Sequence, residues 1–381
     1  MTDRYPRSFY LVIVANLFFF SSFQWTFATL PAYIQEIGGD ATQIGLAFGL
    51  FSLSAVAARP AVGWLVDRWG RKPVLLIGAG IFCLSPVLYA LVSSLWFFQV
   101  VRVLHGAGIA AFTTAYTALA ADLAPPARRG EAIGLSGATN NLGLLFAPAL
   151  GAYAVTAQGY AFHFWASAAV SVPSLLLLLA VREPGRDASV SPTGPGLWDV
   201  ARMRSVWVAA FGSTGLAVAY GAVLSFLAPF ADEWGLTLAG GYFSAFAVAM
   251  MLAQASAGWL SDRIGRRVVA LPGMFLAALA MAGLAVVRTD VALLAAGAGF
   301  GLSWGLVRAG LDTAVVDAVN REARGTALGF LYTCFDIGVG MGSFGLGIVA
   351  QAQSYAAAFL AAAVWAAVAL AGYLTWGRRE G

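Results

Sequence analysis

Long apolar runs constrain this chain more than any other feature of its sequence. A helix needs about 20 apolar residues to cross the hydrocarbon core of a bilayer, where its backbone polar groups must be bonded within the segment. Runs of this kind follow one another along the whole chain and are long rather than alternating. We therefore predict an all-α membrane protein with 12 spanning helices, near 8–31, 42–66, 73–94, 96–122, 130–156, 161–182, 204–231, 238–260, 268–287, 290–318, 325–350 and 355–377.

The composition agrees with a protein that lies in lipid. Charged residues make up 10% of the 381 residues and the mean hydropathy is +0.79, whereas charged residues are about 25% of an ordinary globular chain. The net charge of +4 is spread over short loops between apolar runs. A nucleic-acid-binding protein would cluster that charge on one soluble face, so we predict no nucleic-acid partner.

The sequence predicts no metal site, no cofactor and no enzymatic activity. Cys83 and Cys334 both lie inside apolar runs, and the two histidines are far apart in the sequence, so no metal-ligand cluster or disulfide framework is indicated. The only lysine, Lys72, is followed by Pro73, whereas a nucleotide-binding loop needs Gly-Lys-Ser/Thr. No loop is long enough for a catalytic domain, and no nucleophile constellation is present.

One polar stretch divides the chain into two halves. Residues 183–203, EPGRDASVSPTGPGLWDVARM, are rich in Pro, Gly and Ser, which is typical of a linker. We predict an N-terminal bundle of six helices over 1–182, a cytoplasmic linker over 183–203, and a C-terminal bundle of six helices over 204–381.

Basic residues predict the orientation in the membrane. If the amino terminus is cytoplasmic, the inner segments carry 18 of the 22 Arg and Lys residues and the outer loops carry only Arg288. Because basic loops stay on the cytoplasmic side, we expect a multi-pass protein of the cell membrane with both termini in the cytoplasm. The first run is longer than the core of a signal peptide, so we interpret it as a permanent helix.

The two halves repeat one another. GWLVDRWGRK, at 63–72, returns as GWLSDRIGRR, at 258–267, with an offset of 195 residues. At the same offset Asp122 matches Asp317, and several glycines match without any gap. Because each half has an even number of helices, both halves insert the same way round. Such parallel repeats occur in transporters, where one half rocks against the other around a site near the middle of the membrane.

The decapeptides resemble the loop signature of the major facilitator superfamily, G-x-L-x-D-R-x-G-R-[KR]. RVLHGAGIAA, at 102–111, is similar to the fourth-helix motif of its 12-helix drug:proton antiporter branch, with His105 in place of Gln. GLLFAPALGA, at 143–152, resembles the fifth-helix motif of the same branch. Gly143, Pro148 and Gly151 match that motif, whereas Ala147 and Ala152 replace glycines. This resemblance implies two pseudo-symmetric six-helix bundles and alternating access by a rocker-switch.

The resemblance also implies a conformational latch at the cytoplasmic rim. Asp67 and Asp262 would each cap a helix of the other half, and Arg71 and Arg266 would pair with Asp122 and Asp317. Such a latch favours one conformation and must open in the other. The alternative is that basic loops only fix the topology. The residues proposed for the latch are Gly63, Asp67, Arg68, Gly70, Arg71, Asp122, Asp262, Arg263, Gly265, Arg266 and Asp317.

Charged residues inside the predicted helices are candidates for proton coupling. A charge within the membrane costs at least about 2.5–3.5 kcal/mol, so its presence indicates a function. Asp336 lies near the middle of its helix and is the first choice for a proton carrier; a static salt bridge is the alternative. We also consider an Arg59–Asp336 pair between the halves and a self-neutralising i,i+4 pair. The candidates are Asp336, Arg102, His105, Arg59, Asp312 and Arg308.

Several aromatic and polar residues are candidates for lining a substrate cavity. An apolar cavity with a few polar groups is typical of a small-molecule site. In such a chain the same residues can also face lipid or pack helices together, and both interpretations stay open. The candidates are Gln24, Trp25, Asn141, Tyr220, Phe226, Trp304 and Tyr332.

Together these features predict a secondary transporter, a proton-coupled exporter of small, partly apolar molecules. Its expected partners are a small-molecule substrate, protons and the lipid bilayer, and we expect it to act as a monomer. The alternatives are a uniporter, a proton-coupled importer, or a lipid scramblase or receptor built on the same fold.

Overall fold

The computed structural model describes residues 5–91, 94–125, 128–183, 197–320 and 323–376, and every regular element in these ranges is a helix. Ten helices are long and apolar enough to cross a membrane. One of the ten, α6, consists of two helices, and the 26-residue helix α9 corresponds to the eighth predicted span. The predicted all-α architecture is therefore confirmed.

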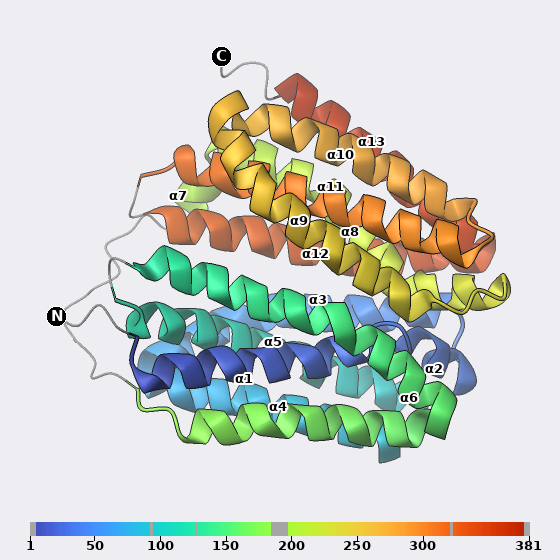
Figure 1. The fold of residues 1–381 in the computed structure, drawn as a ribbon, viewed down its shortest axis with the longest axis horizontal. Helices are drawn as coiled ribbons and strands as arrows, with labels where there is room; N and C mark the ends of the chain where they lie inside the picture. Colours follow the sequence, from blue (N-terminus) through green and yellow to red (C-terminus); the bar gives the residue numbers. More distant parts are fainter. Residues whose placement is uncertain (1–4, 92–93, 126–127, 184–196, 321–322, 377–381) are drawn as a thin grey trace. The chain divides into compact units, whose positions relative to one another are not determined.

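The chain divides into two compact units (Figure 1). Unit 1 comprises residues 1–39 and 50–186, and unit 2 comprises residues 40–49 and 187–381. The helices up to the linker are α1 (Arg7–Trp25), α2 (Leu30–Glu36), α3 (Ala41–Trp69), α4 (Arg71–Leu91), α5 (Leu95–Leu123) and α6 (Arg129–Leu179). Those after it are α7 (Leu197–Ala201), α8 (Arg204–Glu233), α9 (Ala239–Ile264), α10 (Arg266–Ala285), α11 (Asp290–Asp317), α12 (Arg324–Ala352) and α13 (Tyr355–Trp376).

The first predicted helix is shorter than expected. We expected it to end near residue 31, but α1 ends at Trp25 and the short helix α2 follows. Pro31 stands in the first turn of α2, where a proline is tolerated because the amides of the first turn have no partner within the helix. The Thr29 hydroxyl also donates to the Thr26 carbonyl oxygen, at 3.3 Å, which offers the backbone a turn in place of a continuous helix.

The connection between the fifth and sixth predicted spans is shorter than expected. Two spans were predicted, over 130–156 and 161–182, with a loop between them. They meet instead at the single residue Gly159, whose φ of 79° is in the left-handed region that glycine tolerates.

The linker prediction needs one addition, because α7 lies within 183–203. Residues 184–196 lie outside the part of the chain that the structure describes.

Equivalent glycines bring helices together in each unit. A Cβ atom at Gly106 of α5 would collide with the carbonyl oxygen of Phe51 in α3. In unit 2, a Cβ atom at Gly301 of α11 would collide with the carbonyl oxygen of Phe246 in α9. Both pairs are separated by the repeat offset of 195. Small residues at such crossings let backbones approach closely, which is how membrane helices associate. The sequence repeat is thus also a repeat of packing.

Residues 40–49 belong to unit 2 although they begin helix α3. The Ala41 amide donates to Gln351 Oε1 at 3.1 Å. A Cβ atom at Gly45 would collide with the Ser343 carbonyl oxygen, and one at Gly49 would lie 3.1 Å from the Gly340 carbonyl oxygen. The first turns of α3 therefore lie directly against the backbone of α12.

Candidate functional site

Both predicted arginine–aspartate pairs are present, one in each unit. Arg71 Nε lies 2.6 Å from Asp122 Oδ2, and Arg266 Nε lies 3.0 Å from Asp317 Oδ2. All four side chains are partly exposed, and ion pairs at such sites contribute about 0–1 kcal/mol each. They suit contacts that must form and break, and their role as a latch stays a prediction.

The last basic residue of each decapeptide binds the end of another helix. Lys72 Nζ donates to the carbonyl oxygens of Leu179 and Val181, at 2.8 and 2.7 Å. Arg267 Nη2 donates to the carbonyl oxygen of Leu374, at 2.8 Å. Leu179 and Leu374 are again 195 residues apart. A cation at a helix carboxyl terminus bonds to carbonyl groups that have no partner within the helix and is attracted by the helix dipole. The last residue of the motif, Lys72 or Arg267, therefore connects two helices of its own unit.

The sequence analysis did not identify Glu183 as a capping residue, although it lies inside the predicted linker. Its two carboxylate oxygens accept the backbone amides of Arg71 and Lys72, at 2.8 and 3.0 Å, and so cap the amino terminus of α4. Gly70 allows this approach, because its φ is 98° and a Cβ atom there would lie 3.1 Å from Glu183 Oε2. The repeat does not indicate the capping role of Glu183, because the residue 195 positions later is Arg378, which is not an acid.

The other proposed latch residues are less constrained. Within the described residues, a Cβ atom at Gly63 or at Gly265 would meet open space. The Arg68 guanidinium lies 5.1 Å from the centre of the Trp64 ring. The side chain of Asp262 lies outside the part of the chain that the structure describes. Capping by Asp67 and Asp262, and any part played by Arg263, stay predictions.

A further cluster at the same end of unit 1 joins the amino terminus to α6. Arg128 Nε and Nη2 donate to the two carboxylate oxygens of Glu131, at 2.8 and 2.7 Å, and the Tyr5 hydroxyl donates to the Arg128 carbonyl oxygen at 3.1 Å. The bonds from Glu131 raise the pKa of Arg128. Desolvation, followed by the nearby Glu131 charge, raises the pKa of Tyr5. The Arg128 guanidinium therefore stays charged at neutral pH.

Unit 1 contains a buried centre around Arg102 and His105, two predicted residues of α5. Both are 2% exposed, and Tyr89 of α4 is 1% exposed. The Tyr89 hydroxyl lies 3.1 Å from His105 Nδ1, and the Arg102 guanidinium lies 4.4 Å from the centre of the Phe51 ring. His105 Nε2 has no hydrogen-bond partner among the described residues. Sequence reasoning missed Tyr89, which the motif does not include.

Unit 2 contains a second centre around Arg308 and Asp312. Arg308 Nη2 lies 3.1 Å from Asp312 Oδ2, so the predicted i,i+4 pair is formed. The Tyr332 hydroxyl donates to the same carboxylate oxygen at 3.2 Å, and the Arg308 guanidinium lies 4.4 Å from the centre of the Tyr332 ring. Asp312 Oδ1 is buried and has no hydrogen-bond partner among the described residues. The centre therefore has one acceptor left for a donor from elsewhere.

Aromatic rings continue from this centre across unit 2. Trp304, one turn from Arg308 on α11, lies 4.7 Å from Tyr220, 5.6 Å from Phe246 and 5.3 Å from Phe335, measured between ring centres. The structure thus brings together three predicted residues, Tyr220, Trp304 and Tyr332, from α8, α11 and α12. Phe246 and Phe335 were missed, because isolated phenylalanines are common in every apolar run.

Other predicted cavity residues contact neighbouring helices. Phe226 is fully buried and its ring stacks on that of Tyr355. Gln24 is 5% exposed and its Nε2 donates to Asn140 Oδ1 at 2.8 Å. Asn141 follows in the same half of α6 and is half-buried. A part for these residues in a substrate cavity stays a prediction.

The fifth-helix motif packs against α1. A Cβ atom at Gly143 would lie 2.7 Å from Gln24 Oε1, and one at Gly151 would collide with the Trp25 carbonyl oxygen. Pro148 lies inside α6 between these glycines. Gly143 and Gly151 thus have a packing role within unit 1.

Two proton-coupling candidates fall in different units. Arg59 belongs to α3 in unit 1, and Asp336 belongs to α12 in unit 2. Asp336 is half-buried. The proposed pairing of these two side chains stays a prediction.

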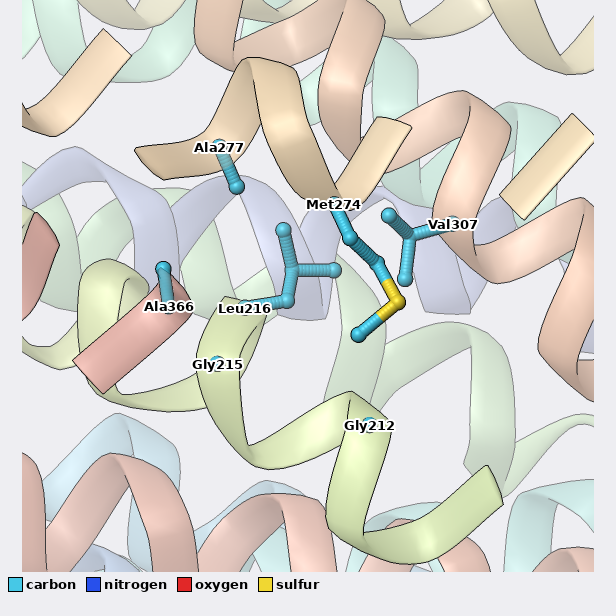
Figure 2. A pocket seen from close by; sticks show the side chains of 7 residues that line it. All are labelled: Gly212, Gly215, Leu216, Met274, Ala277, Val307 and Ala366. Atoms are coloured by element: carbon cyan, nitrogen blue, oxygen red, sulfur yellow. The ribbon is translucent and has the colours of Figure 1, made fainter. Parts of the chain in front are cut away.

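A narrow space between helices, too small to hold a water molecule, lies inside unit 2. Figure 2 shows the side chains of Leu216, Met274 and Val307 around this space, together with glycines of α8. Its lining carries no charged side chain and none of the predicted site residues. A substrate site needs some polar groups to orient its ligand, so this pocket is a feature of helix packing.

A family model described as Major Facilitator Superfamily matches residues 12–309 and, in a second match, residues 209–381. An uncharacterized MFS-type transporter of Methanocaldococcus jannaschii is 23% identical over 348 residues, covering 89% of this chain and 90% of that protein. Multidrug resistance protein 1 of Bacillus subtilis is 26% identical over 177 residues, 46% of each chain. The quinolone resistance protein NorA of Staphylococcus aureus is 23% identical over 160 residues, 42% of this chain and 41% of that one. This chain thus matches less than half the length of these two resistance proteins.

Solved structures share the fold over nearly the whole chain. The nucleoside transporter NupG gives a TM-score of 0.79 at 16% identity, covering 98% of this chain and 100% of that one. A bacterial homologue of the human lysosomal transporter Spinster gives a TM-score of 0.83 at 19% identity, covering 97% and 96%. These likenesses concern the fold, in which 12 spanning helices are expected.

Proposed function

Because this chain belongs to the major facilitator superfamily, we propose that it is a proton-coupled exporter of small, partly apolar molecules that works by alternating access. Membership makes it a multi-pass membrane transporter of small molecules, not an enzyme, as the sequence predicts. Export, proton coupling and the rocker-switch go further than membership does. They are supported by the two buried centres and by the multidrug resistance proteins among its relatives.

The observation that carries the proposal is that each unit holds ionisable side chains deep in its helices. Unit 1 holds Arg102 and His105 beside Tyr89, and unit 2 holds Arg308 and Asp312 beside Tyr332. Charges within spanning helices are costly and mark the pathways of ions and substrates. A transporter that only passed apolar molecules would have no use for them.

We assign proton transfer to these acids and bases and substrate binding to the neighbouring rings. Asp336 is the first candidate for the proton carrier, with Asp312, His105 and the arginines setting its electrostatic surroundings. The rings of Tyr220, Trp304 and Tyr332 offer an apolar surface beside a charged pair, which suits a partly apolar molecule. The altered fifth-helix motif, with Ala147 and Ala152, supports a uniporter or importer as the second candidate.

We further propose that the decapeptide ends face the cytoplasm, where the two ion pairs act as a latch. The repeat places one pair within each unit, so the two bundles would carry equivalent parts of the latch. This orientation follows from the distribution of basic residues and puts both termini in the cytoplasm.

Transport driven by a proton gradient is the first prediction. In proteoliposomes, we expect a panel of fluorescent, partly apolar dyes to move only when an imposed pH gradient drives antiport. Asp336→Asn should abolish the dependence on the gradient, because an amide cannot carry the proton. Asp290→Asn serves as the control, since Asp290 caps the start of α9 through Thr237 and Leu238, away from both centres. Dye movement that ignores the gradient in the parent protein contradicts proton coupling.

The latch gives a second prediction. Asp122→Asn and Asp317→Asn should each shift the balance between conformations, by up to about fivefold, because a partly exposed ion pair contributes up to about 1 kcal/mol. The double variant should combine both shifts. Distances between spin labels on α4 and α10 report the balance. The charge-exchanged pair Arg71→Asp with Asp122→Arg should restore it, and an unchanged distance distribution in the double variant would rule out the latch.

A further inference from the structure

The second histidine of the chain, His163, takes no part in the centres described above. It is fully buried in α6, four residues after the Gly159 junction. Three polar groups from three different places surround its ring. They are the indole of Trp25 at the end of α1, the hydroxyl of Thr29 in the following turn, and the carbonyl of Gly151 in the first half of α6.

Two of these groups compete for one ring nitrogen. His163 Nδ1 lies 3.1 Å from Trp25 Nε1 and 3.0 Å from the Gly151 carbonyl oxygen. An indole nitrogen can only donate and a carbonyl oxygen can only accept. Nδ1 therefore cannot bond to both at once. His163 Nε2 lies 3.0 Å from Thr29 Oγ1, a hydroxyl that can donate or accept.

The two neutral forms of His163 differ in which of these two neighbours the ring can bond to. With the proton on Nε2, Nδ1 accepts from Trp25 but faces the Gly151 oxygen with a lone pair. With the proton on Nδ1, the ring bonds to Gly151 but turns an N–H toward the Trp25 N–H. In the imidazolium form both nitrogens donate, to Gly151 and to Thr29, and only the bond to Trp25 is lost. The Gly151 carbonyl lies within α6, where carbonyl oxygens also accept bonds from helix amides, so the Trp25 N–H is the group that loses its partner when Nδ1 carries a proton.

We propose that His163 is a proton-binding site, at which binding of one proton exchanges the contact with Trp25 for a hydrogen bond to Gly151. The proton adds to Nδ1 of the Nε2–H form, and no other covalent bond is made or broken. The exchange loosens the end of α1 from α6. It occurs where the two helices lie close together, because a Cβ atom at Gly151 would collide with the Trp25 carbonyl oxygen and lie 3.3 Å from His163 Cε1.

The surroundings decide when this proton binds. The rings next to His163 are those of Trp25, Tyr160 and Phe164, all uncharged. The charged residues of the packed helices are Arg7 at the start of α1, Arg129 and Glu131 at the start of α6, Arg71 and Lys72 at the start of α4, and Arg102 and Asp122 of α5, while Glu36 is exposed at the end of α2. A buried imidazolium without a carboxylate beside it is costly. The charged form is therefore stabilised when water reaches this end of unit 1, so its charge reports whether that end is open.

Nitrogen NMR of the histidines tests this site directly. The chain has only two histidines, so His105→Gln leaves a single pair of imidazole signals from ¹⁵N-labelled protein in lipid nanodiscs. We expect the signals to show the Nε2–H form at high pH and the imidazolium on acidification. A ring that stays neutral down to pH 4.5, or that titrates like a histidine in free solution, would overturn the proposal.

Trp25→Phe tests the exchange itself. Without the indole donor, we expect the neutral ring to move its proton to Nδ1, facing Gly151. The midpoint of protonation should rise by about 0.5–1 pH unit, because protonation no longer sacrifices one ordinary hydrogen bond. An unchanged tautomer and midpoint would refute the competition between Trp25 and Gly151. Trp165→Phe, an exposed tryptophan on α6, is the matched control and should change neither.

The site stands on the geometry of unit 1 and does not depend on proton-coupled export. The NMR titration reads His163 without any substrate, whereas dye transport in proteoliposomes reads the proposed function. If His163 titrates as expected while transport ignores the pH gradient, only the proposed function fails. Thr29→Val provides a second variant with a preserved fold. It removes the partner of Nε2 and should favour the Nδ1–H form, so an unaltered tautomer there also counts against the site.

Discussion

Removing Arg308 alone is expected to destabilise the protein more than removing Arg308 and Asp312 together. Arg308→Met leaves the Asp312 carboxylate among Tyr332 and helix backbone without its cation. Breaking one partner of a fully buried pair costs about 3–5 kcal/mol. The two side chains are 19% and 26% exposed, so we expect about 2–3 kcal/mol here. Denaturant unfolding of the purified protein in detergent measures the difference.

The double variant Arg308→Met/Asp312→Leu should lie within about 1 kcal/mol of the parent, because replacing a whole buried pair by apolar groups is often neutral. It should nevertheless lose gradient-driven transport. Stability and activity would then separate, which marks the pair as functional. If the double variant is as unstable as Arg308→Met, the pair holds unit 2 together. If it transports normally, the centre has no part in coupling.

Valine at either crossing glycine should prevent folding. In Gly106→Val and Gly301→Val the new side chain would collide with a backbone carbonyl, that of Phe51 or of Phe246. Ordinary overpacking costs about 1–3 kcal/mol, and a carbonyl held inside a helix cannot move aside, so we expect a larger loss. Size-exclusion chromatography of a fluorescent fusion would show the loss of the monodisperse peak.

Gly134→Val and Gly329→Val form a matched control. These two glycines are also 195 residues apart and also lie in spanning helices, but a Cβ atom at either one would meet open space. Both variants should keep the monodisperse peak. A normal peak for Gly106→Val or Gly301→Val would mean that the helices are farther apart than the structure places them.

Much of the fold could be predicted because its causes are local or repeated. Apolar length fixed the spans, and an exact offset of 195 predicted that Arg71–Asp122 and Arg266–Asp317 would be equivalent pairs. The predicted helix boundaries were wrong where a short local feature determines the backbone conformation. A turn at residues 26–29 interrupts the first predicted helix, and Gly159 replaces a loop by one left-handed residue. Neither effect changes hydropathy, so a reading based on apolar runs overlooks both.

The candidate sites were predictable only in part. Arg102, His105, Arg308 and Asp312 stood out because charged or titratable groups are rare in apolar runs. Their partners did not, since Tyr89 and Phe335 belong to residue types found throughout the chain. Glu183 was hidden for another reason: its role as the cap of α4 depends on a meeting of chain segments more than 100 residues apart. His163 was overlooked because no motif contains it.

Residues 40–49 belong to unit 2, so cutting the chain at the linker separates them from the rest of that unit. A polypeptide starting at residue 187 would leave the Gly340–Gly347 strip of α12 without the ten residues that now cover it. The small residues of α12 would then lose the close helix contact that packs against them, which is a main source of association between membrane helices. Severed halves should accordingly be recovered only when both are co-expressed, with the first supplying the missing coverage by complementation.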